Sequence, residues 1–249
     1  MIETCVVLAV LLMAGSNARQ CEAGESSPHV FVGSSKGLCS GTLIEDGTWV
    51  LTAKHCGDDE HDAIKIKHFD VFKDPSDKKK ILNEESNVKR LGAADIMLLK
   101  LGNKAKMTGA VPLPSDEKCD AVCKNFANKA KIKTVLVGIN VDTLPDFKVL
   151  CAPVEMIECQ RDYHDDGVSY ISATVNCEAC DGDSGGPVFI DKVFMAIHSY
   201  HRKANDGTPI SIDIDACAYK PWIKKQIGKT GPISSEVQCY YHIEFLLPL

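Results

Sequence analysis

The sequence lacks several features that are typical of common classes of protein. After its N-terminal segment it has no run of about eighteen apolar residues, the length that a membrane-spanning helix needs. It has no Asn-x-Ser/Thr acceptor, so the sequence gives no sign of N-glycosylation. Basic residues are not in excess, because 28 Lys and Arg stand against 34 Asp and Glu. We therefore expect neither a membrane nor a nucleic acid as a partner.

The N-terminal segment has the pattern of a secretory signal peptide. Cys5 to Gly15 are apolar but too few to span a bilayer, and Ser16-Asn17-Ala18 places small residues at the two cleavage positions. The acidic Glu3 stands where a basic residue is usual. We expect residues 1–18 to be removed and the mature protein to be secreted and extracellular.

The cysteine content supports the same location. Twelve cysteines in a secreted chain predict disulfide bonds. Removal of the signal peptide would take Cys5 with it and leave an odd number. At least one thiol of the mature protein would then be free or bonded to a partner outside the chain.

Three segments together predict nucleophilic catalysis by a serine. In the segment 180–187, Cys-Asp-Gly-Asp-Ser-Gly-Gly-Pro, glycines flank Ser184 and allow backbone amides to face a developing oxyanion. A serine hydroxyl needs an adjacent base, and the base needs a third group that holds its tautomer. His55 follows the strand-like run from Thr48 to Ala53, and Asp95 stands at the head of a second apolar run. A core histidine, a capping aspartate and a turn serine are the alternatives for each residue alone.

All three segments resemble those of the chymotrypsin-like (trypsin family) serine endopeptidases, over about residues 28–227. The resemblance implies that Ser184 is the nucleophile, His55 the general base and then acid, and Asp95 the carboxylate that orients the imidazole. It implies an oxyanion hole made by the amides of Gly182 and Ser184. It also matches Asp183 with the buried carboxylate that receives the new N-terminus on activation. No cofactor is expected for this acyl-enzyme chemistry.

The resemblance also implies an all-β, chymotrypsin-like fold: two six-stranded antiparallel β-barrels with a C-terminal helix. Short β-type runs bounded by turn residues agree with it, and Pro221 to Gly228 has the pattern of the terminal helix. We expect a signal peptide at 1–18, an N-terminal barrel at 19–112 and a C-terminal barrel with its helix at 113–230. A C-terminal extension, 231–249, has no assigned role.

Disulfide pairings follow from the same resemblance. It implies the pairs Cys39 with Cys56, Cys159 with Cys177, Cys21 with Cys151, and Cys217 with either Cys119 or Cys123. The candidates for the unpaired thiol are Cys180, Cys239 and one of Cys119 or Cys123.

The chain departs from the family at its N-terminus. Active members expose Ile-Val-Gly-Gly or a close variant, whereas the corresponding stretch from Arg19 to Glu25 has no such sequence. Two hypotheses therefore stand: a serine-type endopeptidase, or a catalytically weak or inactive homologue that acts as a binding protein or toxin component. The presence of all three triad residues and of Ser199 favours the enzyme.

The residues expected at the specificity pocket give opposing signals. Glu178, at the pocket floor by resemblance, favours Lys or Arg at the cleaved position (P1), because a carboxylate pairs with a basic side chain. His198 resembles the histidine of glutamate-selective bacterial relatives, in which it receives an acidic side chain. In a third hypothesis, Glu178 and His198 pair with each other and neutralise the pocket. His201 stands where most relatives have glycine and would crowd the substrate.

The substrate-binding residues are thus predicted as Glu178, His198, Ser199, Tyr200 and His201. We lean towards Lys or Arg at P1. The expected partners are a protein or peptide substrate and a protein inhibitor, and the oligomeric state stays open.

A zinc site is the competing interpretation of part of this region. Cys177-x2-Cys180 and His198-x2-His201 have the outline of a zinc site. A secreted, cysteine-rich chain favours disulfides over thiolate ligands. We therefore expect no metal.

Overall fold

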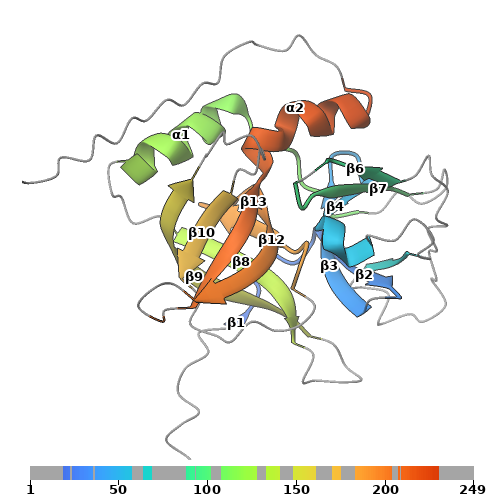
Figure 1. The fold of residues 1–249 in the computed structure, drawn as a ribbon, viewed down its shortest axis with the longest axis horizontal. Coiled ribbons are helices and arrows are strands. Elements are labelled where there is room, and N and C mark those ends of the chain that lie inside the picture. The colour runs from blue at the N-terminus through green and yellow to red at the C-terminus, as the bar shows by residue number, and fades with distance from the viewer. Residues whose placement is uncertain are drawn as a thin grey trace, which may run out of the picture.

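The computed structural model places all thirteen described strands in two antiparallel sheets that lie side by side, with two helices at one end (Figure 1). The structure describes residues 19–22, 24–35, 37–57, 64–68, 88–92, 94–101, 108–127, 133–140, 148–160, 170–174, 183–203, 207 and 209–229. No helix in these ranges is long and apolar enough to cross a membrane.

The first sheet carries the segments of His55 and Asp95. Its six strands have the order β5-β2-β3-β4-β7-β6. They are β2 (His29–Ser34), β3 (Gly37–Ile44), β4 (Trp49–Thr52), β5 (Lys65–His68), β6 (Val88–Arg90) and β7 (Met97–Lys100). Alternate side chains point to opposite faces of a strand. In β2, Val30 and Val32 pack in the core of this sheet, while Phe31 packs in a second cluster with residues of the other sheet.

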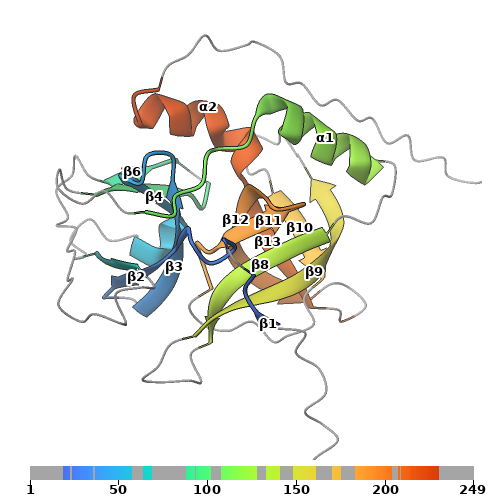
Figure 2. The ribbon, with the colours of Figure 1, turned by 180° about the vertical axis from the view of Figure 1, so that it is seen from behind.

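The second sheet carries Ser184. Its order is β1-β9-β10-β13-β12-β11-β8, and β9 also pairs with β8, so six strands close into a ring and β1 is a seventh at its edge. Figure 2 shows β1 beside β9. The strands are β1 (Arg19–Gln20), β8 (Lys133–Asn140), β9 (Lys148–Gln160), β10 (Tyr170–Thr174), β11 (Pro187–Ile190), β12 (Val193–Lys203) and β13 (Pro209–Asp215). The expected all-β fold with a C-terminal helix is confirmed.

A tight turn fixes the strand pair that follows the nucleophile. Asp191 and Lys192 join β11 to β12, and both have positive φ, 47° and 67°. Two successive residues of this kind form the turn whose twist matches that of the paired strands. The turn pairs Ile190 with Val193 and Phe189 with Phe194, and after a register shift between Val188 and Phe189 the pairing continues to Pro187 with Ile197.

The terminal helix begins earlier than the sequence predicts. Helix α2 (Ala216–Gln226) is capped by Asp215, whose carboxylate accepts the amide of Cys217 at 2.8 Å. Pro221 therefore lies inside the helix and not in its first turn.

The sequence analysis missed helix α1 (Asp116–Ala127). Its start has a usable signal: Ser115 accepts the amide of Lys118 at 3.2 Å, and Asp116 and Glu117 occupy the first turn. The buried Lys220 of α2 donates to Pro114 O at 2.9 Å and pairs with Asp116, which joins the two helices.

Three disulfides are present among the described residues. Cys21–Cys151 ties β1 to β9, Cys39–Cys56 ties β3 to the turn that carries His55, and Cys119–Cys217 ties α1 to α2. Each is one of the expected pairings, and Cys119 is the partner of Cys217. Cys177 lies outside the described ranges, so its expected bond with Cys159 stays a prediction.

Thiol counting tests the cysteine arithmetic. If Cys5 leaves with the signal peptide, the purified protein should contain an odd number of free thiols per monomer, because each disulfide uses two cysteines. Thiol titration of the denatured, unreduced protein and a non-reducing gel measure this number. A monomer without any free or capped thiol would show that the signal-peptide assignment is wrong.

Candidate active site

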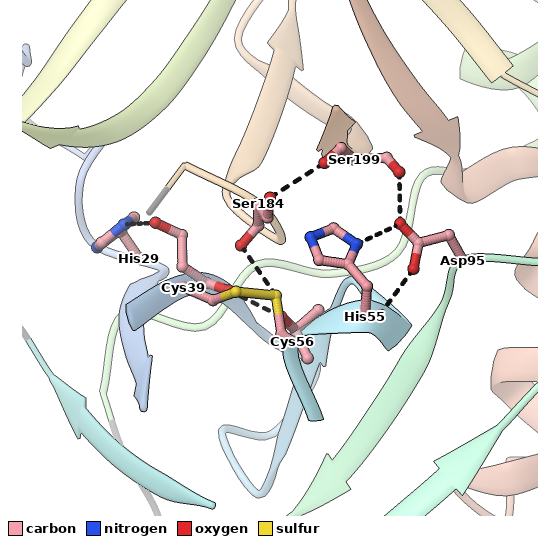
Figure 3. Close-up of a disulfide and its surroundings, with 9 residues drawn as sticks. His29, Cys39, His55, Cys56, Asp95, Ser184 and Ser199 are labelled. Carbon is pink, nitrogen blue, oxygen red and sulfur yellow. Dashed lines mark hydrogen bonds and ion pairs between the residues drawn. A yellow bond between two sulfur atoms is a disulfide. The ribbon is translucent and has the colours of Figure 1, made fainter. Parts of the chain in front are cut away.

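His55 lies on a short turn that follows a buried strand. The four residues of β4 are all buried, and the chain then forms a 3-10 turn, η1 (Lys54–Gly57). Within η1, Cys56 points inwards and bonds to Cys39 of β3, whereas the side chain of His55 is 47% exposed. The disulfide therefore anchors the turn, and Figure 3 shows the imidazole directed away from the disulfide and towards Asp95.

Asp95 lies in the loop between β6 and β7 and faces His55. Its Oδ2 is 2.8 Å from Nδ1 of His55, and its Oδ1 accepts the His55 backbone amide at 2.9 Å. The hydroxyl of Ser199, on β12 of the other sheet, also donates to Oδ2. Both carboxylate oxygens are thus occupied, and the carboxylate fixes the imidazole in orientation (Figure 3).

The charge of Asp95 follows from these contacts. Burial raises the pKa of the carboxyl, but hydrogen bonds from the His55 side chain, the Ser199 hydroxyl and the His55 amide outweigh it and lower the pKa to about 2. The group is therefore ionised at neutral pH. An ionised carboxylate at Nδ1 favours the tautomer with its proton on Nδ1 and stabilises the imidazolium.

Ser184 lies in a turn that contacts both sheets. Its carbonyl accepts the amide of Ser40 from β3 at 2.8 Å. The next residue, Gly185, donates its amide to the carbonyl of His198 on β12 at 2.7 Å. Gly185 has φ of 86°, and a Cβ there would lie 2.2 Å from both Ser40 O and Thr52 Oγ1. Only glycine fits this position, for conformation and for space.

The Ser184 hydroxyl donates to the carbonyl oxygen of Ser199 at 3.0 Å. Figure 3 shows the imidazole of His55 between Ser184 and Asp95. For its proton to reach His55, the hydroxyl must release its bond to Ser199 O and turn its O–H towards the imidazole. Such realignment is common between a free catalytic serine and its substrate complex.

Asp183 is buried directly before the nucleophile. Its carboxylate packs against Gly138 of β8, where an added Cβ would lie 2.1 Å from Oδ1. Gly182, expected to contribute to the oxyanion hole, lies outside the described residues, so the structure gives the position of Asp183 and Ser184 alone from this part of the loop.

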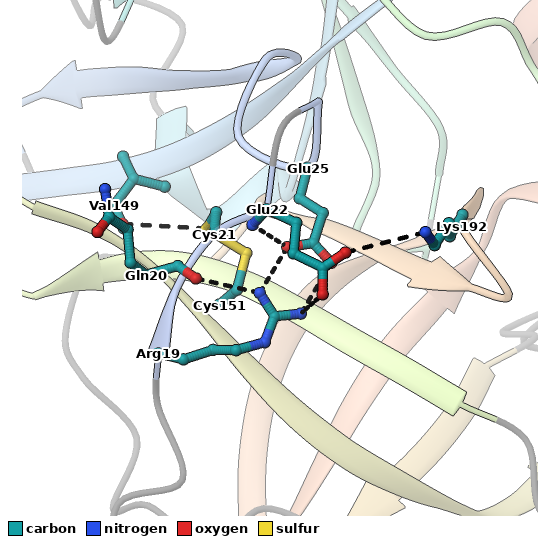
Figure 4. A network of polar contacts seen from close by, with 8 residues as sticks. All are labelled: Arg19, Gln20, Cys21, Glu22, Glu25, Val149, Cys151 and Lys192. Atoms are coloured by element: carbon teal, nitrogen blue, oxygen red, sulfur yellow. Dashed lines mark hydrogen bonds and ion pairs between the residues drawn. A yellow bond between two sulfur atoms is a disulfide. The ribbon is translucent and has the colours of Figure 1, made fainter.

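The N-terminal segment is fixed at the edge of the second sheet (Figure 4). Arg19 pairs in register with Cys151 of β9, and its guanidinium donates to both carboxylate oxygens of Glu25, at 2.8 and 2.9 Å. The side-chain hydrogen bond to Glu25 raises the pKa of Arg19. Glu22 lies within 3.9 Å of Arg19 and 3.8 Å of Lys192, so opposite charges alternate along this edge.

In the pocket region, His198 bonds to a carboxylate that the sequence analysis did not identify. Nδ1 of His198 is 2.8 Å from Oδ1 of Asp213, and both side chains are almost completely buried. Ser211 donates to the other oxygen of Asp213 at 2.8 Å. Asp213 stands directly opposite His198 in the β12–β13 register. A sequence signal for Asp213 exists, because the polar residues Ser211, Asp213 and Asp215 alternate with isoleucines in β13 and therefore share one face of the strand.

Glu178 lies in a segment that the structure does not describe, so its expected contact with His198 is not tested. The contact with Asp213 bears on the hypothesis that Glu178 and His198 pair, because Nδ1 of His198 already has a carboxylate partner and only Nε2 would be left for Glu178.

His201 packs against His198 with its ring 4.2 Å away, centroid to centroid. Both ring nitrogens are buried and have no hydrogen-bond partner in the described part of the chain. Burial, together with the neighbouring His198, lowers the pKa of His201 to about 4. His201 is therefore neutral at physiological pH. Next to it, Tyr200 is exposed and Ser199 is buried.

The side chains that could group around a metal ion do not make a convincing metal site. Within the described ranges these groups are Cys39 with His55 and Cys56, and Cys21 with Glu25 and Cys151. Each contains the two sulfurs of a disulfide, which are not thiolates. Cys177 and Cys180, of the alternative zinc pattern, are not among the described residues.

The low pKa of Asp95 predicts a pH-dependent stability difference. The folded-state pKa is about 2 against an ordinary value of 3.8, so the stabilisation is present above 3.8 and is lost as the pH falls through about 2. In urea unfolding between about pH 4 and about pH 2, the difference between wild type and Asp95→Asn should shrink as the pH falls. Asp191→Asn, in the exposed β11–β12 turn, is the control. A difference that is independent of pH would contradict the assignment.

Comparisons with known proteins agree with this geometry. A family model described as Trypsin matches residues 16–223. The chain is 30% identical over 245 residues to granzyme B of Homo sapiens, covering 90% of this chain and 98% of that protein. It is 25% identical over 261 residues to kallikrein-8 of Rattus norvegicus, covering 92% and 96%.

Two solved structures share the fold at low identity. Kallikrein-related peptidase 10 has a TM-score of 0.57 at 22% identity, covering 84% of this chain and 100% of that one. Human heparin binding protein has a TM-score of 0.61 at 16% identity, covering 87% and 98%. Since the family model spans most of the chain and the two-sheet fold agrees, this protein belongs to the trypsin family of chymotrypsin-like serine proteases, as a distant homologue of granzymes and kallikreins.

Proposed function

We propose that the protein is a secreted serine endopeptidase that hydrolyses peptide bonds through an acyl-enzyme. The observation that supports this most is the ionised Asp95 bonded to Nδ1 of His55, with the imidazole lying between Asp95 and Ser184 (Figure 3). The glycine-dependent turn at Ser184 adds to it, because it holds the serine in a backbone position that few sequences allow. The three disulfides agree with an oxidising, extracellular location.

In the proposed reaction, the Ser184 hydroxyl rotates towards His55 and attacks the substrate carbonyl as His55 accepts its proton. The imidazolium is stabilised by Asp95 and then donates the proton to the leaving amine. The amides of Gly182 and Ser184 would bind the oxyanion. A water molecule, activated by His55, then hydrolyses the acyl-enzyme and restores Ser184.

A binding protein without catalysis is the second candidate function. Two observations favour it: the stretch from Arg19 to Glu25 lacks an activation sequence and is bound to β9, and the Ser184 hydroxyl donates to Ser199 O. One protein of the same fold is named for heparin binding and not for proteolysis, so the fold does not decide between the two.

Replacement of the nucleophile separates these functions. Wild-type protein should react with a fluorophosphonate probe and cleave casein, whereas Ser184→Ala should lose the labelling and about ten-thousand-fold or more of the activity, because only the hydroxyl is removed. Ser35→Ala, on the exposed β2–β3 turn, is the control. Absence of labelling in the wild type would support the binding protein, and residual activity in Ser184→Ala would remove Ser184 as nucleophile.

We further propose a preference for Lys or Arg at P1. The described residues there offer no unpaired cation to an acidic substrate, because His198 is bonded to the Asp213 carboxylate and His201 is neutral. Glu178, at the pocket floor by family resemblance, would then set the preference by pairing with a basic side chain.

A peptide-library cleavage profile tests this preference. Lys and Arg should dominate at P1, and Glu178→Gln should reduce the ratio of basic to neutral substrates by at least about tenfold, because the carboxylate partner of the basic side chain is lost. Glu117→Gln, on α1, is the matched control. A dominance of acidic residues would overturn the proposal in favour of His198, and indifference to charge would support mutual neutralisation of Glu178 and His198.

A further inference from the structure

The nucleophile turn of the second sheet rests on buried polar groups of the first sheet. Ser40 of β3 donates its amide to the Ser184 carbonyl at 2.8 Å, and its own carbonyl accepts the Thr52 hydroxyl at 2.8 Å. The hydroxyl of Thr42 donates to the carbonyl of Gly185 at 3.2 Å. Ser40, Thr42 and Thr52 are all completely buried. We call these three residues the polar platform.

A histidine outside the triad completes this platform. His29, the first residue of β2, is completely buried, and its Nε2 is 2.8 Å from the hydroxyl oxygen of Ser40. Its ring packs edge-on against Phe31, with the centroids 5.1 Å apart. Burial of an imidazole is costly unless its polar atoms are hydrogen-bonded, so the bond to Ser40 offsets part of the cost of burying His29. Figure 3 draws the bond of His29 to the Ser40 hydroxyl as a dashed line.

The close packing at Gly185 makes the position of Ser184 sensitive to Ser40. The space that a Cβ of Gly185 would need is already taken by Ser40 O and Thr52 Oγ1, so the turn and the platform are in direct contact. A shift of the Ser40 backbone would therefore move Ser184 relative to His55, which lies in the same first sheet as the platform. Misplacement of a reacting group by about 1 Å can cost about a hundredfold in rate.

We propose that His29 is a positioning residue for Ser184, which acts through Ser40: the imidazole fixes the Ser40 side chain, and the Ser40 amide fixes the Ser184 carbonyl. The effect on catalysis rests on the proposed endopeptidase function. The effect on the Ser40 amide does not, because it concerns the hydrogen bond itself.

Substitutions can separate the hydrogen bond from the volume of the ring. His29→Phe keeps an aromatic ring but removes the bond to Ser40. His29→Gln supplies an amide with both a donor and an acceptor, so it can bond to the Ser40 hydroxyl in either direction. Ser40→Ala removes the other partner. Thr134→Val, a buried hydroxyl of β8 with no hydrogen-bond partner among the described residues, is the control for loss of a buried polar group.

A double-mutant cycle gives the catalytic readout. His29→Phe and Ser40→Ala should each slow fluorophosphonate labelling and lower kcat by about tenfold, with KM within about twofold of wild type. The double variant should be no slower than either single variant, because both remove the same bond. His29→Gln should restore most of the rate, and Thr134→Val should behave as wild type. Additive losses, or a loss in His29→Gln equal to that in His29→Phe, would overturn the proposal.

Amide hydrogen exchange gives a readout that needs no activity. His29→Phe should speed exchange of the Ser40 amide by at least about tenfold relative to wild type, His29→Gln and Thr134→Val, because the bond to Ser184 O opens more often. Unchanged exchange in His29→Phe would overturn the proposal even if the enzyme is active. If the wild type is not labelled by the probe but the exchange difference is present, the endopeptidase function fails and the positioning contact stands.

Discussion

The turn at Ser184 is the constraint on which the rest of the site depends, because it is bonded to both sheets. Ser40 of the first sheet donates to the Ser184 carbonyl, and His198 of the second sheet accepts the Gly185 amide. The turn is bonded to both sheets, and Gly185 lies in the left-handed region, so the backbone conformation of the turn is tightly restricted. The relative position of the sheets therefore decides where the hydroxyl lies, and a change in either sheet reaches the nucleophile.

Asp95 is the second link between the sheets, and its charge is a consequence of that role. It receives the side chain and the amide of His55 from the first sheet and the hydroxyl of Ser199 from the second. Burial alone would favour the neutral carboxyl, but three donors on two oxygens stabilise the anion. The same bonds orient the imidazole, so the geometry of the base and its electrostatics have one origin. Ser199 serves both residues, since its hydroxyl faces Asp95 and its carbonyl accepts from Ser184.

The sequence predicted the features that lie in continuous segments. The triad residues, the fold class and three disulfides follow from local patterns and the family resemblance that they carry. Helix α1 was missed although Ser115, Asp116 and Glu117 give a capping signal, because the stretch was taken as a boundary loop. The partner of His198 could not be predicted, since Asp213 meets it only through the β12–β13 register, which shifts between His198 and Tyr200. The contact of His29 with Ser40 could not be predicted for the same reason. The two residues meet across the paired strands β2 and β3, and neither local sequence indicates the other as a partner.

The N-terminal segment lies at the edge of the second sheet and makes none of the bonds that hold the nucleophile turn described here. Arg19 is paired with Cys151, and its guanidinium is engaged by Glu25, so this segment is committed to the edge of β9 by strand pairing, a disulfide and an ion pair. The carboxylate of Asp183 meanwhile packs on Gly138 of β8, inside the second sheet. Order in the turn is supplied by contacts with Ser40, Thr42 and His198, none of which belongs to the N-terminal segment. These bonds hold the Ser184 carbonyl and Gly185 without any contribution from Arg19 to Glu25, so this part of the turn does not depend on an activation sequence.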